Sequence, residues 1–146
     1  MRHMPENMQN QSIIDGIRVF KASNVKIIDS VYFQLAESLA NIDLLKYIKI
    51  YNGRLCASNQ LSENKKKAPI IKFGIEGLVG VELLVDSSIR TIQFYSIVSS
   101  QKGYGRKIVK AVVDAIPDTW FIVVVFDSSG GFWSKMVEEY PRIMVI

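Results

Sequence analysis

A turn with two glycines, Gly103 and Gly105, separates an apolar run at residues 89–98 from an amphipathic helix pattern that follows it. Glycine lets the backbone pass close to a ligand, and the first turn of a helix presents unpaired N–H groups and the positive end of the helix dipole. Lys102 and Arg106 add positive charge at the same place. The segment therefore predicts a strand, a phosphate-binding turn and a helix.

The length of the chain limits it to one domain. Its 146 residues are 49% hydrophobic and 22% charged, which is typical of a globular protein. We expect residues 1–12 to be a flexible polar leader and residues 13–146 to form a single domain. The single cysteine, Cys56, excludes an internal disulfide and favours a reducing compartment, so the expected location is cytoplasmic. The apolar run at 121–126 is far shorter than the roughly 20 residues of a membrane span, so we expect no membrane partner.

Hydrophobic periodicity predicts the order of the elements in this domain. We expect strands at residues 13–20, 54–57, 70–73, 79–85, 89–98, 119–126 and 143–146. We expect a helix or a helix pair over 25–48 and single helices at 106–116 and 131–140. Short connectors between the strands from 70 to 98 indicate antiparallel neighbours, because a parallel return needs a longer crossover. The pattern predicts a mixed α+β fold around one sheet.

A dinucleotide-binding turn is an alternative interpretation of the glycine segment. A strand, a Gly-x-Gly turn, a helix and a second strand ending at Asp127 imitate that unit. However, Ile108 occupies the position of the third glycine, and fewer than about 20 residues remain after Asp127 for the rest of a doubly wound sheet. A P-loop is also disfavoured, because no Gly-Lys-Ser/Thr follows the turn.

The turn and its surroundings match a known family better. Ser100-Gln101-Lys102-Gly103-Tyr104-Gly105 resembles the Arg/Gln-x-x-Gly-x-Gly/Ala signature of the GCN5-related N-acetyltransferases. Phe132-Trp133-Ser134-Lys135-Met136 is similar to the Phe-Tyr-x-Lys-Leu type of stretch in a later helix of that family. The resemblance covers residues 70–140. It implies a mixed central sheet with an antiparallel meander and helices on both faces.

The resemblance also implies a function, the transfer of an acetyl group from acetyl-coenzyme A to an amine. The residues implied for binding acetyl-coenzyme A are Ser96, Ile97, Val98, Gln101, Lys102, Gly103, Tyr104, Gly105 and Arg106. The amine must lose a proton before attack, so a carboxylate or a water chain has to act as base. Glu82 is our candidate and Glu76 the reserve, and no metal is implied. Trp133 stands where many members of the family have the tyrosine that protonates the departing thiolate, so the acid has no candidate.

Other classes of function stay open. The same fold without catalysis, as a module that binds coenzyme A or a partner, is the second hypothesis, because position 133 is not a tyrosine. A nucleic-acid-directed protein is the third, because the net charge is +4 and the pI is near 9.2. Nucleic acid is the less favoured partner, since the basic residues are spread along the chain rather than gathered on one face.

The acceptor and the oligomeric state are not determined by the sequence. A small molecule, a protein and aminoacyl-tRNA all remain acceptor classes for the amine. The apolar segment at residues 143–146 is an edge strand that could pair with another chain, so a homodimer is a further hypothesis. Cys56 is expected to be a small buried residue rather than a nucleophile, because no histidine lies nearby to activate it.

Overall fold

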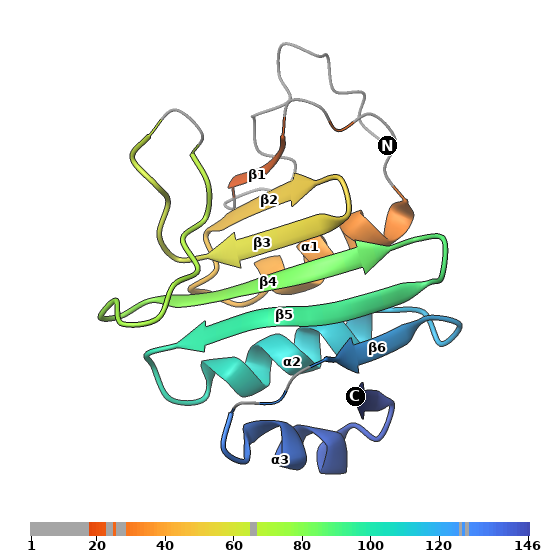
Figure 1. Cartoon of the computed structure of the whole chain (residues 1–146). Coiled ribbons are helices and arrows are strands. Elements are labelled where there is room, and N and C mark those ends of the chain that lie inside the picture. The colour runs from red at the N-terminus through yellow and green to blue at the C-terminus, as the bar shows by residue number, and fades with distance from the viewer. Residues whose placement is uncertain (1–17, 23–24, 26–28, 65–66, 126, 128) are drawn as a thin grey trace.

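The computed structural model describes residues 18–146 except 23–24, 26–28, 65–66, 126 and 128 (Figure 1). These residues form one seven-stranded sheet whose strands lie side by side in chain order. The strands are β1 (Arg18–Lys21), β2 (Tyr47–Tyr51), β3 (Arg54–Ser58), β4 (Val79–Asp86), β5 (Thr91–Ser99), β6 (Phe121–Val124) and β7 (Ile143–Val145). The helices are α1 (Ser30–Ala40), α2 (Tyr104–Ala115) and α3 (Phe132–Glu139).

The sheet is mixed, as the sequence predicts. Strands β2 to β5 form an antiparallel meander. The pairs β1–β2, β5–β6 and β6–β7 are parallel. A helix fills each of these parallel returns, whereas Asn52 and Gly53, with Gly53 at φ 73°, form the tight turn between β2 and β3. The mixed α+β fold class is therefore confirmed.

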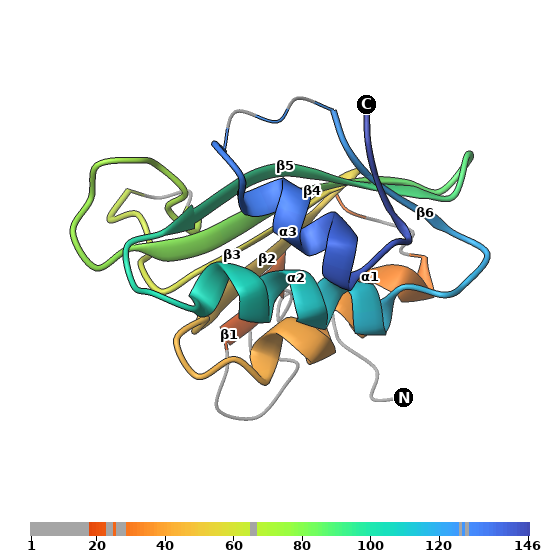
Figure 2. The same cartoon turned by 90° about the horizontal axis from the view of Figure 1, so that it is seen from below.

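One face of the sheet carries the hydrophobic core. In β4 the alternate residues Val79, Val81, Leu83 and Val85 are buried beneath the helices, while Glu82 between them is only half-buried on the other face. Helices α1 and α2 lie together on the same side of the sheet (Figure 2). This period of two is what a sheet covered on one face requires.

All three helices pack on that face, so the expectation of helices on both faces is wrong for the described residues. The Ser38 hydroxyl of α1 donates to the Ala111 carbonyl of α2 at 2.6 Å. Trp133 and Met136 of α3 belong to the same core. A loop covers one end of the opposite face instead, where Ser58 Oγ donates to the Ile70 carbonyl at 2.6 Å.

Several expected elements differ from the observed ones. Residues 70–73 are not a strand, because the loop there makes only an isolated bridge between Leu61 and Pro69. The helical pattern over 25–48 is interrupted at Asn41, which caps α1 at its C-terminus, and Ile48 lies in β2. Ile42 and Leu45 are buried in the turn between α1 and β2, so the apolar spacing continues although the helix has ended.

The ends of the expected elements differ as well. The leader at residues 1–12 and the first part of the expected first strand lie outside the described residues. The expected strand at 119–126 is shorter, Phe121–Val124, and residue 126 is outside the described part. Ile122, Val123 and Val124 of this strand are buried, whereas Phe121 at its start is 55% exposed. In the part of the chain that the structure describes, the helices are too short for a membrane span.

Arg142 ties the end of α2 to β7. Its guanidinium donates to the carbonyls of Ile116 at 2.8 Å, of Trp120 at 3.1 Å and of Val113 at 3.4 Å, and also to that of Pro117. The last carbonyls of a helix have no partner within the helix, so an arginine there satisfies groups that otherwise need water.

We predict that Arg142→Met destabilises the protein. Hydrogen bonds to a charged donor contribute about 1.5–3 kcal/mol each, but the site is partly exposed, so we expect a net loss of about 2 kcal/mol. This loss corresponds to a decrease in melting temperature of about 4–8 °C for a chain of this size. Lys110→Met, which removes the exposed pair with Asp114 at 2.6 Å, is the control and should cost less than about 1 kcal/mol. Equal losses in the two variants, measured by calorimetry, would contradict this role of Arg142.

Candidate functional site

A pocket of about 440 Å³ opens where β5 and β6 diverge. The two strands pair only at residues 91–93 of β5 and 121–123 of β6. Figure 1 shows β6 running along only the first part of β5. The residues that line the pocket include Ser96, Ile97, Gly105, Ser129, Phe132 and Trp133. In the described part of the chain, no strand pairs with the β6 side of residues 94–99.

An aromatic cluster keeps the two strands apart on the core side. The ring centroids of Phe94 and Trp133 are 4.9 Å apart, and those of Phe132 and Trp133 are 5.1 Å apart. Trp133 is 7% exposed and contributes to the core. The first residues of α3 therefore form one wall of the pocket.

The segment before α3 is held by a local hydrogen-bond network. The Asp127 carboxylate accepts from the backbone N–H of Ser129 at 2.9 Å and from its hydroxyl. These bonds from Ser129 lower the pKa of Asp127. Ser129 Oγ in turn accepts from the backbone N–H of Trp133 at 3.2 Å. Asp127 and Ser129 thus support the start of α3, and Gly131 is the N-cap itself.

A β-bulge lies at the mouth of the pocket. Leu83 of β4 pairs with Phe94 and Glu82 pairs with Ser96, so Tyr95 is an extra residue in β5. Its side chain is 61% exposed. A bulge bends the strand and interrupts its ladder, and bulges are common beside active sites. Ser96, Ile97 and Val98, the strand residues expected to bind the donor, follow this bend.

The glycine turn is adjacent to the same pocket, and its two glycines have different roles. Gly103 is the N-cap of α2 with φ 90°, a conformation that favours glycine, and no described side chain caps the helix. Gly105 lies inside the first turn, and a Cβ there would be 3.2 Å from the Phe132 ring. Position 105 therefore requires glycine because α3 packs against it. The sequence suggested instead that both glycines let a ligand approach the backbone.

Side chains of the turn point in several directions. Arg106 forms an ion pair with Glu139 at 2.8 Å, at the far end of α3. The Tyr104 hydroxyl donates to Asp43 at 3.1 Å. The Gln101 amide donates to the Gly77 carbonyl at 3.3 Å, and Lys102 is exposed. The turn therefore offers a ligand mainly its backbone N–H groups and the Lys102 ammonium.

Glu82 lies on the sheet face opposite the helices, beside the bulge. Its cross-strand neighbours are Cys56 on β3 and Ser96 on β5. The Glu82 carboxylate accepts from Arg54 at 3.2 Å and is 17% exposed. Glu76, the reserve base, is exposed in the loop before β4 and does not line the pocket.

Sequence reasoning missed Arg54 and Tyr51. The Arg54 guanidinium lies over the Tyr51 ring at 4.2 Å from its centroid, in addition to its pairing with Glu82. The expected strand at 70–73 separated 54–57 from 79–85 in the predicted order, so these two strands were not expected to pair. In the structure β3 pairs directly with β4, and Arg54 lies two residues from Cys56, the partner of Glu82.

Within the described residues, no group of His, Cys, Asp or Glu side chains is arranged to hold a metal ion. No protein-family model, curated protein or solved structure matches the chain.

We predict that Cys56 is chemically inert in the folded protein. Burial, followed by the charge of Glu82, raises the pKa of its thiol to about 12. The thiol therefore stays protonated at pH 8, and only the thiolate reacts with iodoacetamide. Mass spectrometry should show slow alkylation of the native protein and fast alkylation in denaturant. Rapid labelling of the native protein at pH 8 would show that Cys56 is accessible and ionised.

Proposed function

We propose that the chain is an acetyl-coenzyme A-dependent N-acyltransferase, with its donor site in the pocket between β5 and β6. The observation that carries the proposal is the convergence of two kinds of backbone group on one pocket. Among the residues that the structure describes, no strand pairs with the edge at residues 96–98 on that side, and the uncapped first turn of α2 begins beside it at Gly103 and Tyr104.

These groups fit the two parts of the donor. An extended pantetheine arm with amide groups can pair with an open strand edge, as an added strand does. The N–H groups around Gly103 to Arg106 suit a pyrophosphate, because the first turn of a helix favours negative charge. Lys102 adds a mobile ammonium beside them. Arg106 would contribute its backbone N–H, since its side chain pairs with Glu139.

Glu82 is the proposed base. Antiparallel cross-strand neighbours have Cβ atoms about 5 Å apart, so its carboxylate lies near Ser96 and the bulge. An amine approaching over the open face gives one proton to Glu82 or to a water beside it, and then has a lone pair for attack. Acetyl-coenzyme A bound there would supply the thioester, whose C–S bond breaks as the C–N bond forms.

Protons balance without an acid from the protein. The ammonium gives up one proton before attack and a second as the amide forms, and the thiol takes up one from solvent, so one proton is released per turnover. Trp133 cannot replace a tyrosine as the acid, because its indole N–H does not ionise in the usual range and the ring is buried against Phe94.

A module that binds coenzyme A without catalysis is the second candidate. Two observations favour it. Trp133 stands where catalytic members of the resembling family have a tyrosine, and the candidate base Glu82 is already paired with Arg54. The two candidates share the donor site and differ only in turnover.

We predict that acetyl-coenzyme A raises the melting temperature. A ligand at 100 times its Kd stabilises the folded state by about 2.7 kcal/mol, which corresponds to a rise of several degrees for this chain. Gly105→Asp should abolish the shift, because the new side chain meets Phe132 and adds negative charge at the helix N-terminus.

The control for that variant is Ser87→Asp. It adds the same charge in the exposed hairpin before β5, at the other end of that strand. It should leave the thermal shift unchanged. No shift for the wild type at millimolar acetyl-coenzyme A would rule out both candidate functions.

We further predict that Glu82→Gln separates catalysis from donor binding. Loss of a general base lowers turnover by about 10²- to 10⁴-fold. The Glu82 carboxylate is not expected to contact the donor's phosphates, so donor binding should not change. The measurement is thiol release with a panel of amines, alongside the thermal shift with acetyl-coenzyme A. Turnover that survives Glu82→Gln would remove Glu82 as base, and a wild type that binds but never turns over would select the non-catalytic module.

A further inference from the structure

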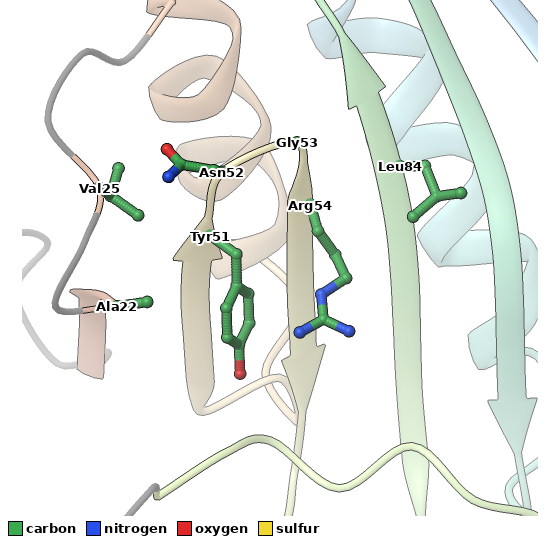
Figure 3. Close-up of a pocket in the computed structure, with 7 residues that line it drawn as sticks. All are labelled: Ala22, Val25, Tyr51, Asn52, Gly53, Arg54 and Leu84. Atoms are coloured by element: carbon green, nitrogen blue, oxygen red, sulfur yellow. The ribbon is translucent and has the colours of Figure 1, made fainter.

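A second pocket, of about 430 Å³, lies beside the hairpin of β2 and β3, between residues of the open face and the edge of the core (Figure 3). Ala22, Val25 and Leu84 contribute apolar side chains to its walls, and Tyr51 and Arg54 contribute polar groups. Figure 3 shows the Tyr51 ring and the Arg54 side chain running side by side on the neighbouring strands β2 and β3. The pocket and the donor site are therefore separate hollows.

The charged pair Arg54–Glu82 connects these two hollows across the open face. Arg54 lines the second pocket, and its guanidinium reaches Glu82 at 3.2 Å. Glu82 is the cross-strand neighbour of Ser96, which lines the first pocket. A molecule lying between the pockets thus meets a cation on one side and a carboxylate on the other.

The guanidinium is held in a defined orientation. It lies over the Tyr51 ring at 4.2 Å, and Tyr51 and Arg54 are directly opposite each other in the β2–β3 ladder. Stacking on an aromatic ring leaves the edge of the guanidinium, with its paired N–H groups, facing a carboxylate, which in this structure is that of Glu82 at 3.2 Å. The side chain of Arg54 is 42% exposed, so a ligand from solvent can reach it.

We propose that the acceptor is a zwitterionic amino acid, with its carboxylate bound by Arg54 and its ammonium beside Glu82. This inference rests on the proposed acyltransferase function, for which it names the substrate class. The acceptor inserts into the Arg54–Glu82 pair and replaces one ion pair by two. Its own side chain occupies the second pocket, against Ala22, Val25 and Leu84.

This placement puts the reacting nitrogen where the transfer needs it. The carboxylate and the amine of an amino acid are attached to one carbon, so binding of the carboxylate at Arg54 leaves the nitrogen at Glu82, next to the bulge. The Arg54–Glu82 pair is part-buried, and the ammonium and carboxylate of the acceptor replace each partner's lost charge contact when the pair opens. An amine without a carboxylate has no such anchor.

Binding to the intact protein tests the inference without relying on turnover. The probes are leucine, phenylalanine and lysine, each compared with the amine that lacks only the carboxylate: isopentylamine, phenethylamine and cadaverine. Calorimetric titration with and without coenzyme A should show at least one amino acid binding tenfold or more tightly than its amine. Equal binding within all three pairs, or no binding of any amino acid at millimolar concentration, would overturn the inference.

Variants of Arg54 test whether this residue causes the preference for the amino acid over its amine. Arg54→Gln should weaken binding of the preferred amino acid at least tenfold and change that of its amine less than twofold. Arg54→Lys keeps the charge but not the paired N–H groups, and should bind with intermediate affinity. Lys110→Gln, which removes one positive charge from an exposed ion pair on α2, is the matched control and should bind like the wild type. An undiminished preference in Arg54→Gln, with its melting temperature checked, would also overturn the assignment.

Failure of the acyltransferase proposal would be seen in a different measurement. Absence of a thermal shift with acetyl-coenzyme A would contradict the donor site. The amino-acid titration would still show whether the second pocket binds an amino acid. If amines are acetylated but those with and without a carboxylate have equal kcat/KM, the function stands and the substrate class is wrong. For an active enzyme, Arg54→Gln should raise KM for the amino acid with little change in kcat.

Discussion

The short pairing of β5 with β6 determines how the rest of the structure can be used. After three paired residues, the rings of Phe94, Phe132 and Trp133 occupy the space on the core side that a continued ladder would close. Gly105 lets α2 approach Phe132 closely enough to complete that wall. The unpaired strand edge and the start of α2 then face the same pocket. Without the aromatic cluster, β6 could extend along β5 and satisfy its backbone groups, and the site would disappear.

The one-sided packing of the helices has an equally direct consequence. Because α1, α2 and α3 all bury their apolar faces on the same side, the opposite face carries polar and charged side chains, among them Arg54 and Glu82. The Arg54 side chain is 42% exposed and that of Glu82 is 17% exposed, so the ion pair offsets the partial desolvation of the carboxylate. The bulge at Tyr95 bends β5 beside the donor pocket, and the pairing of β5 with β4 resumes at Ser96. In the proposed reaction, donor and acceptor therefore approach β5 from different directions.

Strong local patterns predicted much of this fold. The alternation in β4 and the apolar stripe that ends before Pro117 in α2 are complete within their own segments, so both elements appear within about two residues of their expected bounds. The prediction of a strand at 70–73 was wrong because a short apolar run without alternation does not distinguish a strand from a loop that packs on a sheet. The helical spacing through Ile42 and Leu45 was misleading because a buried turn also places apolar residues three apart. The expectation of helices on both faces was wrong because no local sequence pattern determines on which face of the sheet a helix packs.

The sequence by itself determined that an antiparallel meander leads into a glycine turn and a helix, and the structure adds that Gly103 is the N-cap of that helix, at a left-handed φ. These properties depend on adjacent residues and on backbone sterics. Only the tertiary structure decided that Gly105 packs on Phe132, that Arg106 pairs with Glu139, and that Arg54 reaches Glu82. Each of these contacts joins residues more than two dozen positions apart, so strand register and helix packing had to bring them together before their charges or volumes could interact.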